Sequence, residues 1–231
     1  MDILFTTYFT KDLSFSQHDS SGGCKPNKYR LMERWYKSVW SNQIDSIVFH
    51  NELSNGFIRK YETKCIKFSK WGEENRPSYN DERFYCFLNY LKEHENIKRV
   101  FCTDIFDVEI LRNPFELITD EYDLYLGSEC NPSRGWIKKK GKEISLPQPD
   151  IDSGEIYYNA GIIGGKRENI IKLFELMLFE FNNIPKEINA NIPVYNYCLH
   201  KVFNGNYFTG HPLHNVFKSN KVTEGVYIKH K

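Results

Sequence analysis

The chain has 231 residues, a formal net charge of +1 and a mean hydropathy of −0.58. This length fits one α/β domain, and we assign residues 1–231 to it. The near-zero net charge gives no electrostatic footprint for nucleic acid or for an anionic membrane, so we expect no nucleic-acid partner. No apolar run approaches the roughly 20 residues of a membrane span, and the N-terminus lacks the features of a signal peptide. We therefore expect a cytoplasmic protein without a membrane span.

The chain contains six cysteines, and none of them forms a C-x-x-C pair. They are Cys24, Cys65, Cys86, Cys102, Cys130 and Cys198. Their neighbours are mostly apolar, which is typical of buried reduced thiols and not of a disulfide framework or a zinc site.

Strands and helices alternate in the first half of the chain. The apolar run Asp2–Tyr8 predicts a first strand, and a repeat of four in Leu31, Trp35 and Val39 predicts a helix over Pro26–Ser41. Further β-rich runs predict strands at Asp45–His50, Lys64–Phe68 and Lys98–Cys102, with an amphipathic helix over Asn80–His94.

The second half continues the alternation around one interruption. Residues 131–155 are rich in Pro, Gly and Lys, which predicts a long surface loop. On either side we expect strands at Asp123–Gly127 and Ile156–Ile163, helices at Arg167–Phe181 and Pro193–Phe203, and a tail of loop and strand. This pattern predicts an α/β, Rossmann-like fold with a mixed, mostly parallel sheet flanked by helices. Ligands of such folds bind beyond the carboxyl ends of the strands.

A pair of carboxylates follows the predicted strand Lys98–Cys102. Asp104 and Asp107 stand three positions apart where this apolar strand ends. Two such carboxylates repel each other unless a cation compensates them, and oxygen ligands of this kind suit Mg²⁺ or Mn²⁺. A simple turn or helix cap would explain the pair equally well.

Several segments together resemble the GT-A glycosyltransferases. Residues 101–115 resemble the D-x-D segment of that group, in the form T-D-x-x-D followed by N-P-F. Other similar segments follow in the same order as in the group: 3–8, 79–84, 123–129, 158–165 and 211–218. Within the GT-A enzymes, the chain resembles the glycogenin and bacterial lipopolysaccharide galactosyltransferase group. The resemblance implies a single GT-A domain that uses Mn²⁺ or Mg²⁺ to move a sugar from a nucleotide-diphosphate donor, expected to be a UDP-sugar, to a glycan or glycoconjugate acceptor.

The resemblance also implies roles for single residues. It implies metal ligands at Asp104, Asp107 and His214, with His211 as an alternative histidine and with ribose binding as an alternative role for Asp104. It implies donor contacts from Thr7, Tyr8, Arg83, Asn159, Ala160 and Lys218, with the Tyr8 ring expected to stack on the base of the donor. Purely structural roles stay open for several of these residues. Tyr8 could be a core residue, Arg83 could lie on a solvated helix face, and the Asn159–Gly161 segment could form a tight turn.

One position departs from the family pattern. Asn191 stands where the family usually carries an acid, and an amide cannot accept a proton as a general base. Glu129 and the loop carboxylates Asp150 and Asp152 are the other candidates for a catalytic carboxylate, and a route that retains the anomeric configuration needs no base.

Two alternative functions follow. A sugar- or nucleotide-binding domain that has lost catalysis is consistent with the amide at Asn191, whereas a sugar-phosphate nucleotidylyltransferase is a poor match because no glycine-rich loop follows Asp2–Tyr8.

In the 131–155 segment, Trp136 and the lysines at 138–140 are candidates for acceptor contacts or a lid, or for a solvated loop tip.

Overall fold

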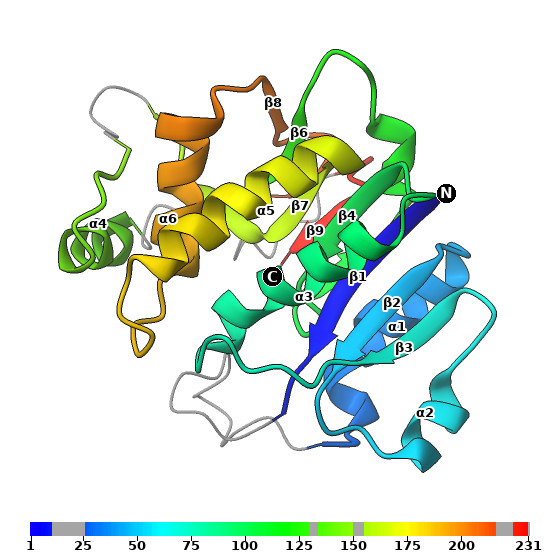
Figure 1. The fold of residues 1–231 in the computed structure, drawn as a ribbon. Helices are drawn as coiled ribbons and strands as arrows, with labels where there is room; N and C mark the ends of the chain where they lie inside the picture. Colours follow the sequence, from blue (N-terminus) through cyan, green and yellow to red (C-terminus); the bar gives the residue numbers. More distant parts are fainter. Residues whose placement is uncertain (11–25, 130–133, 150–154, 216–223, 231) are drawn as a thin grey trace.

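The computed structural model describes residues 1–10, 26–129, 134–149, 155–215 and 224–230, and its centre is a seven-stranded mixed sheet (Figure 1). The strand order is β3-β2-β1-β4-β7-β6-β8. Strands β1 to β4 run parallel to one another, and β7 is antiparallel to both of its neighbours. The strands are β1 (Asp2–Tyr8), β2 (Ser46–His50), β3 (Ile66–Lys70), β4 (Arg99–Thr103), β6 (Leu124–Ser128), β7 (Tyr158–Lys166) and β8 (Tyr207–Thr209). The expected mixed, mostly parallel sheet is confirmed.

Helices cover both faces of this sheet. One face carries α3 (Tyr79–Glu93), α5 (Arg167–Asn182) and α6 (Asn191–Tyr197), which continues into the π-helix η5 (Cys198–Phe203). The other face carries α1 (Tyr29–Ser41), α2 (Asn55–Tyr61) and the small antiparallel sheet of β5 (Val108–Ile110) and β9 (Ile228–His230). The 3₁₀ helix η2 (Pro114–Leu117) lies between β5 and β6, and α4 (Arg134–Glu143) lies between β6 and β7.

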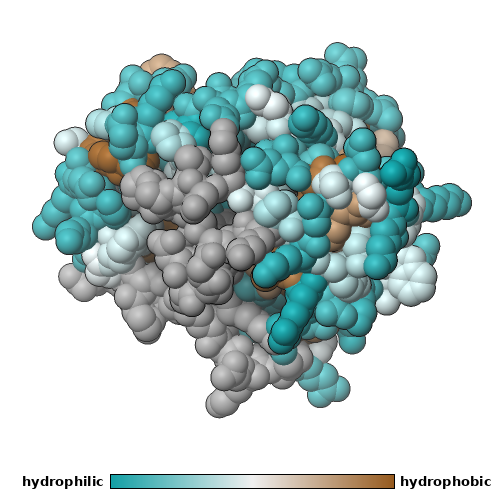
Figure 2. All heavy atoms as spheres, turned by 90° about the horizontal axis from the view of Figure 1, so that it is seen from below, coloured by the Kyte–Doolittle hydropathy of each residue, from teal (hydrophilic) through white to brown (hydrophobic). Residues whose placement is uncertain are grey.

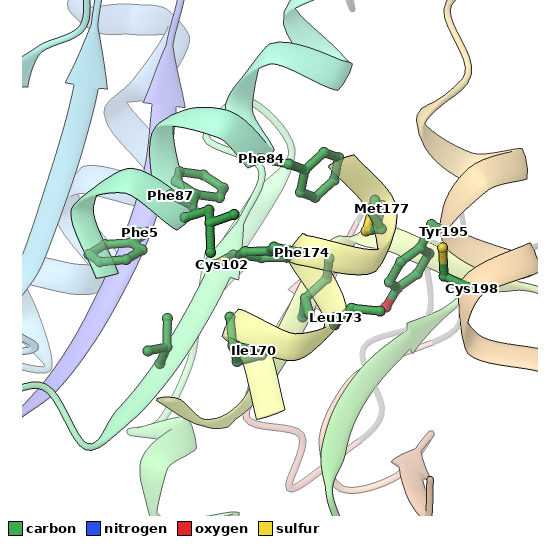
Figure 3. Packing of buried hydrophobic residues seen from close by; sticks show 14 of the residues in the cluster. Phe5, Phe84, Phe87, Cys102, Ile170, Leu173, Phe174, Met177, Tyr195 and Cys198 are labelled. Carbon is green, nitrogen blue, oxygen red and sulfur yellow. The ribbon is translucent and has the colours of Figure 1, made fainter. Parts of the chain in front are cut away.

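The core consists of two layers that the strand alternation separates. On β1, Phe5 packs toward α3 while Leu4 packs toward α1, because successive side chains of a strand point to opposite faces. Figure 3 shows the first layer, in which Phe84 and Phe87 of α3 meet Phe174 of α5. Burial of such aromatic side chains stabilises the fold by about 1.5–3 kcal/mol each.

Gly164 of β7 serves this packing. A Cβ on Gly164 would lie 2.1 Å from Cε1 of Phe101, so the glycine lets the Phe101 ring lie flat across β7. Gly164 is therefore explained by packing and needs no role in ligand binding.

Several elements differ from the sequence-based expectation. Strand β3 is shifted by two residues from the predicted Lys64–Phe68, and β7 begins two residues after the predicted Ile156 and ends at Lys166. Helix α1 begins at Tyr29, three residues after the predicted start, and α2 was not predicted because its seven residues carry one buried side chain, Phe57. The predicted 131–155 loop is wrong for its first part, where residues 134–143 form α4. Its packing is set by tertiary contacts of Ile137 and Gly141, and local composition did not show them.

The cysteines that the structure describes are buried and unpaired, as expected. They are Cys65, Cys86, Cys102 and Cys198, and Cys24 and Cys130 lie outside the described residues. Burial raises the pKa of Cys86, Cys102 and Cys198, which keeps these thiols protonated and unreactive. Among the described helices, none combines the length and the apolar character that crossing a bilayer demands.

Candidate active site

Two carboxylates and one histidine meet beyond the carboxyl end of β4. Asp104 and Asp107 follow β4, and His230 ends β9. One ligand atom from each of the three lies within 4.8 Å of the others. His230 Nε2 is 3.6 Å from Asp107 Oδ2 and 3.9 Å from Asp104 Oδ2. Figure 2 views the molecule from the side where β1 to β4 end, and hydrophilic side chains predominate among the residues that it colours.

Hydrogen bonds with the neighbouring strands β1 and β7 and with helix α1 hold the end of β4. Thr6 of β1 donates its hydroxyl to the Thr103 carbonyl at 2.7 Å, and the Trp35 indole N–H donates to Thr103 Oγ1 at 2.9 Å. The Asp104 amide donates to the Gly161 carbonyl at 3.1 Å. These bonds fix the backbone from which the Asp104 side chain projects.

Asn215 holds the backbone of His230 through two hydrogen bonds. Asn215 Oδ1 accepts the His230 amide at 2.7 Å, and Asn215 Nδ2 donates to the His230 carbonyl at 3.1 Å. The pairing of β9 with β5 places His230 opposite Val108, directly after Asp107. The histidine is therefore brought to the carboxylates by a strand that lies 120 residues later in the chain.

Gly161 leaves the space in which the cluster fits. A Cβ at this position would lie 2.5 Å from His230 Cε1 and 2.6 Å from Asp104 Oδ2. It would also lie 2.8 Å from Asn159 Oδ1, which accepts the Gly161 amide at 2.7 Å. No larger residue fits here unless the three side chains move apart.

Arg83 of α3 makes an ion pair with Asp104. Its Nη1 contacts Asp104 Oδ1, and its side chain is only 4% exposed. Asp104 thus turns one oxygen to Arg83 and the other to His230. The arrangement places a fixed cation beside the cluster, where an incoming anion would meet it.

His214 lies outside the cluster, contrary to the expectation that it would be a metal ligand. Its Nδ1 donates to the Asn215 carbonyl at 2.6 Å, and its Nε2 accepts the amides of Gly210 at 3.0 Å and Ser128 at 3.2 Å. Burial lowers the pKa of His214, so the ring is neutral. Both ring nitrogens are occupied, and His214 instead anchors the turn that carries Asn215.

The two residues at the end of β1 differ in their placement. Thr7 is half-buried, whereas Tyr8 is fully buried and its ring packs against Phe57 and Phe106. The Tyr8 hydroxyl donates to the Lys28 carbonyl at 3.0 Å. No face of the Tyr8 ring is open to a base, so the structure does not support the stacking role expected for it.

Asn159 links a carboxylate to the cluster. Its Nδ2 donates to Glu129 Oε2 at 2.7 Å, while its Oδ1 holds the Gly161 amide. Ala160, between them, packs into the core and is 3% exposed. Glu129 is thereby connected to Asp104 through Asn159 and Gly161.

Asn191 begins α6 and is nearly buried. Its Oδ1 accepts the amide of its neighbour Ile192 at 2.7 Å. The preceding amide, that of Ala190, donates to Asp81 of α3 at 3.2–3.3 Å. Burial raises the pKa of Asp81 to about 6, against the opposing effects of that amide and of Arg76.

The predicted residues Asp150, Asp152 and Lys218 lie outside the described residues, and His211 is exposed with Nε2 bonded to the Glu224 carbonyl at 3.1 Å.

A cavity of about 240 Å³ opens at the carboxyl ends of β2 and β3, on the α3 side of the sheet. Phe9, Trp71 and Tyr79 contribute aromatic rings to its wall. The Trp71 indole N–H is fixed by Glu82 Oε1 at 2.7 Å, and Asn51 Nδ2 donates to the Tyr79 hydroxyl at 3.1 Å. The sequence pattern did not predict this cavity, because its residues come from the segments that follow β1, β2 and β3 and from the start of α3.

The donor set of the cluster fits a divalent cation. Ligands about 2.1 Å from Mg²⁺ or Mn²⁺ lie about 3 Å apart when they are adjacent, so the separations of His230 Nε2 from the two carboxylates would need to shrink by less than about 1 Å. Two carboxylates suit both ions, and the imidazole of His230 favours a transition ion such as Mn²⁺.

This sheet and its flanking helices have the architecture of the GT-A fold. The crystal structure of an active-site mutant of LgtC, a GT-A lipopolysaccharide galactosyltransferase, is similar to it with a TM-score of 0.60 and 16% sequence identity, over 100% of this chain and 86% of the LgtC chain. No protein-family model matches the chain, and a comparison with curated protein sequences finds no match. The structural likeness establishes the fold.

Proposed function

We propose that the protein is a metal-dependent glycosyltransferase that moves a sugar from a nucleotide-diphosphate donor, most simply a UDP-sugar, to a hydroxyl of a glycan or glycoconjugate. The observation that carries the proposal is the cluster of Asp104, Asp107 and His230 at the carboxyl end of β4 in a GT-A fold. These three residues would hold Mn²⁺ or Mg²⁺, with His230 in the place first expected of His214.

The bound cation would supply charge compensation for the diphosphate as the bond between the anomeric carbon and the phosphate oxygen breaks. Arg83, fixed beside Asp104, adds a second positive charge on the same side and stabilises the departing nucleoside diphosphate. Lys218 stays a further candidate for that role.

The donor's base has a natural place in the aromatic cavity. Phe9, Trp71 and Tyr79 offer ring faces for stacking. Glu52 and Glu73 also line the cavity and disfavour a phosphate there. We therefore assign the cavity to the neutral base and the cluster beyond β4 to the diphosphate.

The sugar lies closest to Asn159, Ala160 and Gly161 in this assignment, because Gly161 borders both Asp104 and His230. Glu129 is the candidate base among the described carboxylates, since the Asn159 amide fixes its orientation. Asp152 and Asn191 remain candidates for catalysis or positioning.

A second candidate function is nucleotide-sugar binding without turnover. It is favoured by Asn191, an amide at the position where the GT-A resemblance leads one to expect an acid, whose Oδ1 accepts a hydrogen bond from Ile192 of its own helix. Both functions predict that UDP binding needs the metal. Hydrolysis of a panel of UDP-sugars in the presence of Mn²⁺ separates them, since an enzyme releases UDP and a binding domain does not. Calorimetric titration with UDP gives the first test: equal affinity in Mn²⁺ and in excess chelator would contradict both functions.

A further inference from the structure

Helix α4 presents an unusual concentration of positive charge. Its ten residues contain five basic side chains and one acidic one, a formal net charge of +4, whereas the whole chain carries +1. Lys140 is 2.8 Å from Glu143 and is neutralised by it. For Lys138, Lys139 and Lys142, no ion pair is found within the described part of the chain. The charge of this helix is therefore directed outward and not into the protein.

The helix is fixed to the body of the protein. Ile137 is fully buried, and Gly141 packs so closely on Gln148 that a Cβ would lie 2.2 Å from Gln148 Cγ. Gln148 Nε2 in turn donates to the Pro193 carbonyl of α6 at 3.2 Å. Figure 1 shows α4 beside α6 at one end of the molecule. A helix anchored in this way presents its outer side chains in a constant arrangement.

The outer side of α4 combines lysines with an indole. Trp136, Lys139 and Lys142 are spaced by three residues and share the side opposite Ile137 and Gly141. Trp136 is 42% exposed, although a tryptophan on a soluble surface is usually covered. Lysine beside tryptophan on one helix side is typical of helices that lie in the headgroup region of a bilayer.

Further exposed apolar side chains lie at the same end of the molecule. Ile156 is 44% exposed, and its carbonyl is 2.8 Å from His200 Nε2 in η5. Val202 of η5 is 39% exposed, and Lys201 beside it adds another positive charge. The described residues of the end formed by α4 and η5 thus offer scattered apolar side chains among lysines, and among them there is no continuous apolar patch that a protein partner would bury.

We propose that this end of the molecule, with α4 at its centre, docks on the surface of an anionic lipid bilayer. The lysines face the anionic headgroups, and Trp136 enters the interfacial layer. Because α4 begins five residues after Glu129, docking would set the rim of the candidate active site against the membrane. The inference concerns binding at the lipid surface and does not depend on the metal or the donor.

The test is binding of the full chain to vesicles of phosphatidylcholine alone and of phosphatidylcholine with 30% phosphatidylglycerol, about 30% being enough to give a strongly negative surface. We expect cosedimentation with the anionic vesicles only, reversed by about 0.5 M salt. The Lys138→Gln/Lys139→Gln/Lys142→Gln variant should bind about 100-fold more weakly, or about fivefold per lysine. A matched control, Lys37→Gln/Lys67→Gln/Lys92→Gln, removes the same charge from exposed lysines elsewhere and should bind like the parent.

Trp136 gives an independent readout. Its emission should shift to shorter wavelength with anionic vesicles, and Trp136→Phe should lose the shift while keeping Trp40 as an exposed indole. Equal binding to neutral vesicles, or equal weakening by both triple variants, would overturn the proposal. So would binding to soluble heparin with none to anionic vesicles, because a soluble polyanion would then be the partner.

Discussion

Replacing Gly161 by alanine tests the candidate metal centre with the smallest change that the chain allows. The residue lies within β7, and the added methyl group points at His230, Asp104 and Asn159. None of these three side chains is altered chemically. Any effect on metal binding must therefore come from their displacement.

The size of the displacement follows from the distances. Ordinary contact begins at 3.4 Å, so His230 Cε1, at 2.5 Å from the new Cβ, has to retreat by about 0.9 Å, and Asp104 Oδ2, at 2.6 Å, by about 0.8 Å. Metal-ligand distances tolerate changes of about 0.2 Å. Misplaced ligands and their supporting residues typically cost 10–100-fold in metal affinity, which we expect here. The crowding should also lower the free energy of unfolding by about 1–3 kcal/mol.

The assay is titration with Mn²⁺ followed by electron paramagnetic resonance, beside thermal unfolding with and without Mn²⁺. Gly164→Ala is the control for stability, because its Cβ would clash with Phe101 in the core and should lower thermal stability while leaving Mn²⁺ affinity unchanged. Gly135→Ala is the control for the substitution itself, since nothing lies within 4 Å of its Cβ. Parental Mn²⁺ affinity in Gly161→Ala would refute the assignment of the metal to this cluster.

Four further outcomes are expected. His230→Gln should lower Mn²⁺ affinity by about 10–100-fold, whereas His214→Gln should chiefly lower thermal stability. If His214→Gln instead lowers Mn²⁺ affinity and His230→Gln does not, His214 is the metal ligand. Arg83→Gln should weaken UDP binding in Mn²⁺ by about tenfold or more in calorimetry, because a charge-assisted contact is lost. Trp71→Ala should weaken the same binding by about 1–3 kcal/mol if the base stacks in the aromatic cavity, and unchanged affinity would place the base elsewhere. Burial and Lys70 lower the pKa of His50 from 6.5 to about 4, so the free energy of unfolding should fall as the pH drops from 6.5 toward 4. In urea titrations, His50→Asn should flatten this pH dependence. A His50 pKa near 6.5, measured by NMR, would contradict the prediction.

Much of the fold could be predicted because hydrophobic periodicity is a local property. The run Asp2–Tyr8 matches β1 residue for residue, and the repeat in Leu31, Trp35 and Val39 gave α1 to within three residues. Helix α4 could not be predicted in this way. Its glycines and lysines are ordinary for a loop, and it is a helix because Ile137 and Gly141 find partners in the tertiary structure.

The candidate site was only partly predictable for the same reason. Asp104 and Asp107 stand three positions apart at a strand end, so a possible role in metal binding could be inferred from a short stretch of sequence. His230 depends on the pairing of β9 with β5, a contact between residues 120 positions apart, whereas His214 lies in the segment whose sequence resembled the family. One signal was present: the alternation in Val226, Ile228 and His230 marks a strand whose buried positions include the histidine.

Two sets of hydrogen bonds hold the parts of the candidate site together, and they bear on the role of Asn191. Glu129 is tied through Asn159 to Gly161 and so to the metal ligands, while Asp81 ties α3, which carries Arg83, to the amide that precedes Asn191. Asn191 therefore sits on a helix whose start is fixed to the donor side of the site by a neighbouring carboxylate. A residue at such a position is held well enough to orient a ligand without acting as a base. The carboxylate that is both connected to the metal ligands and oriented by an amide is Glu129, and a base, if the reaction uses one, is better sought there than on α6.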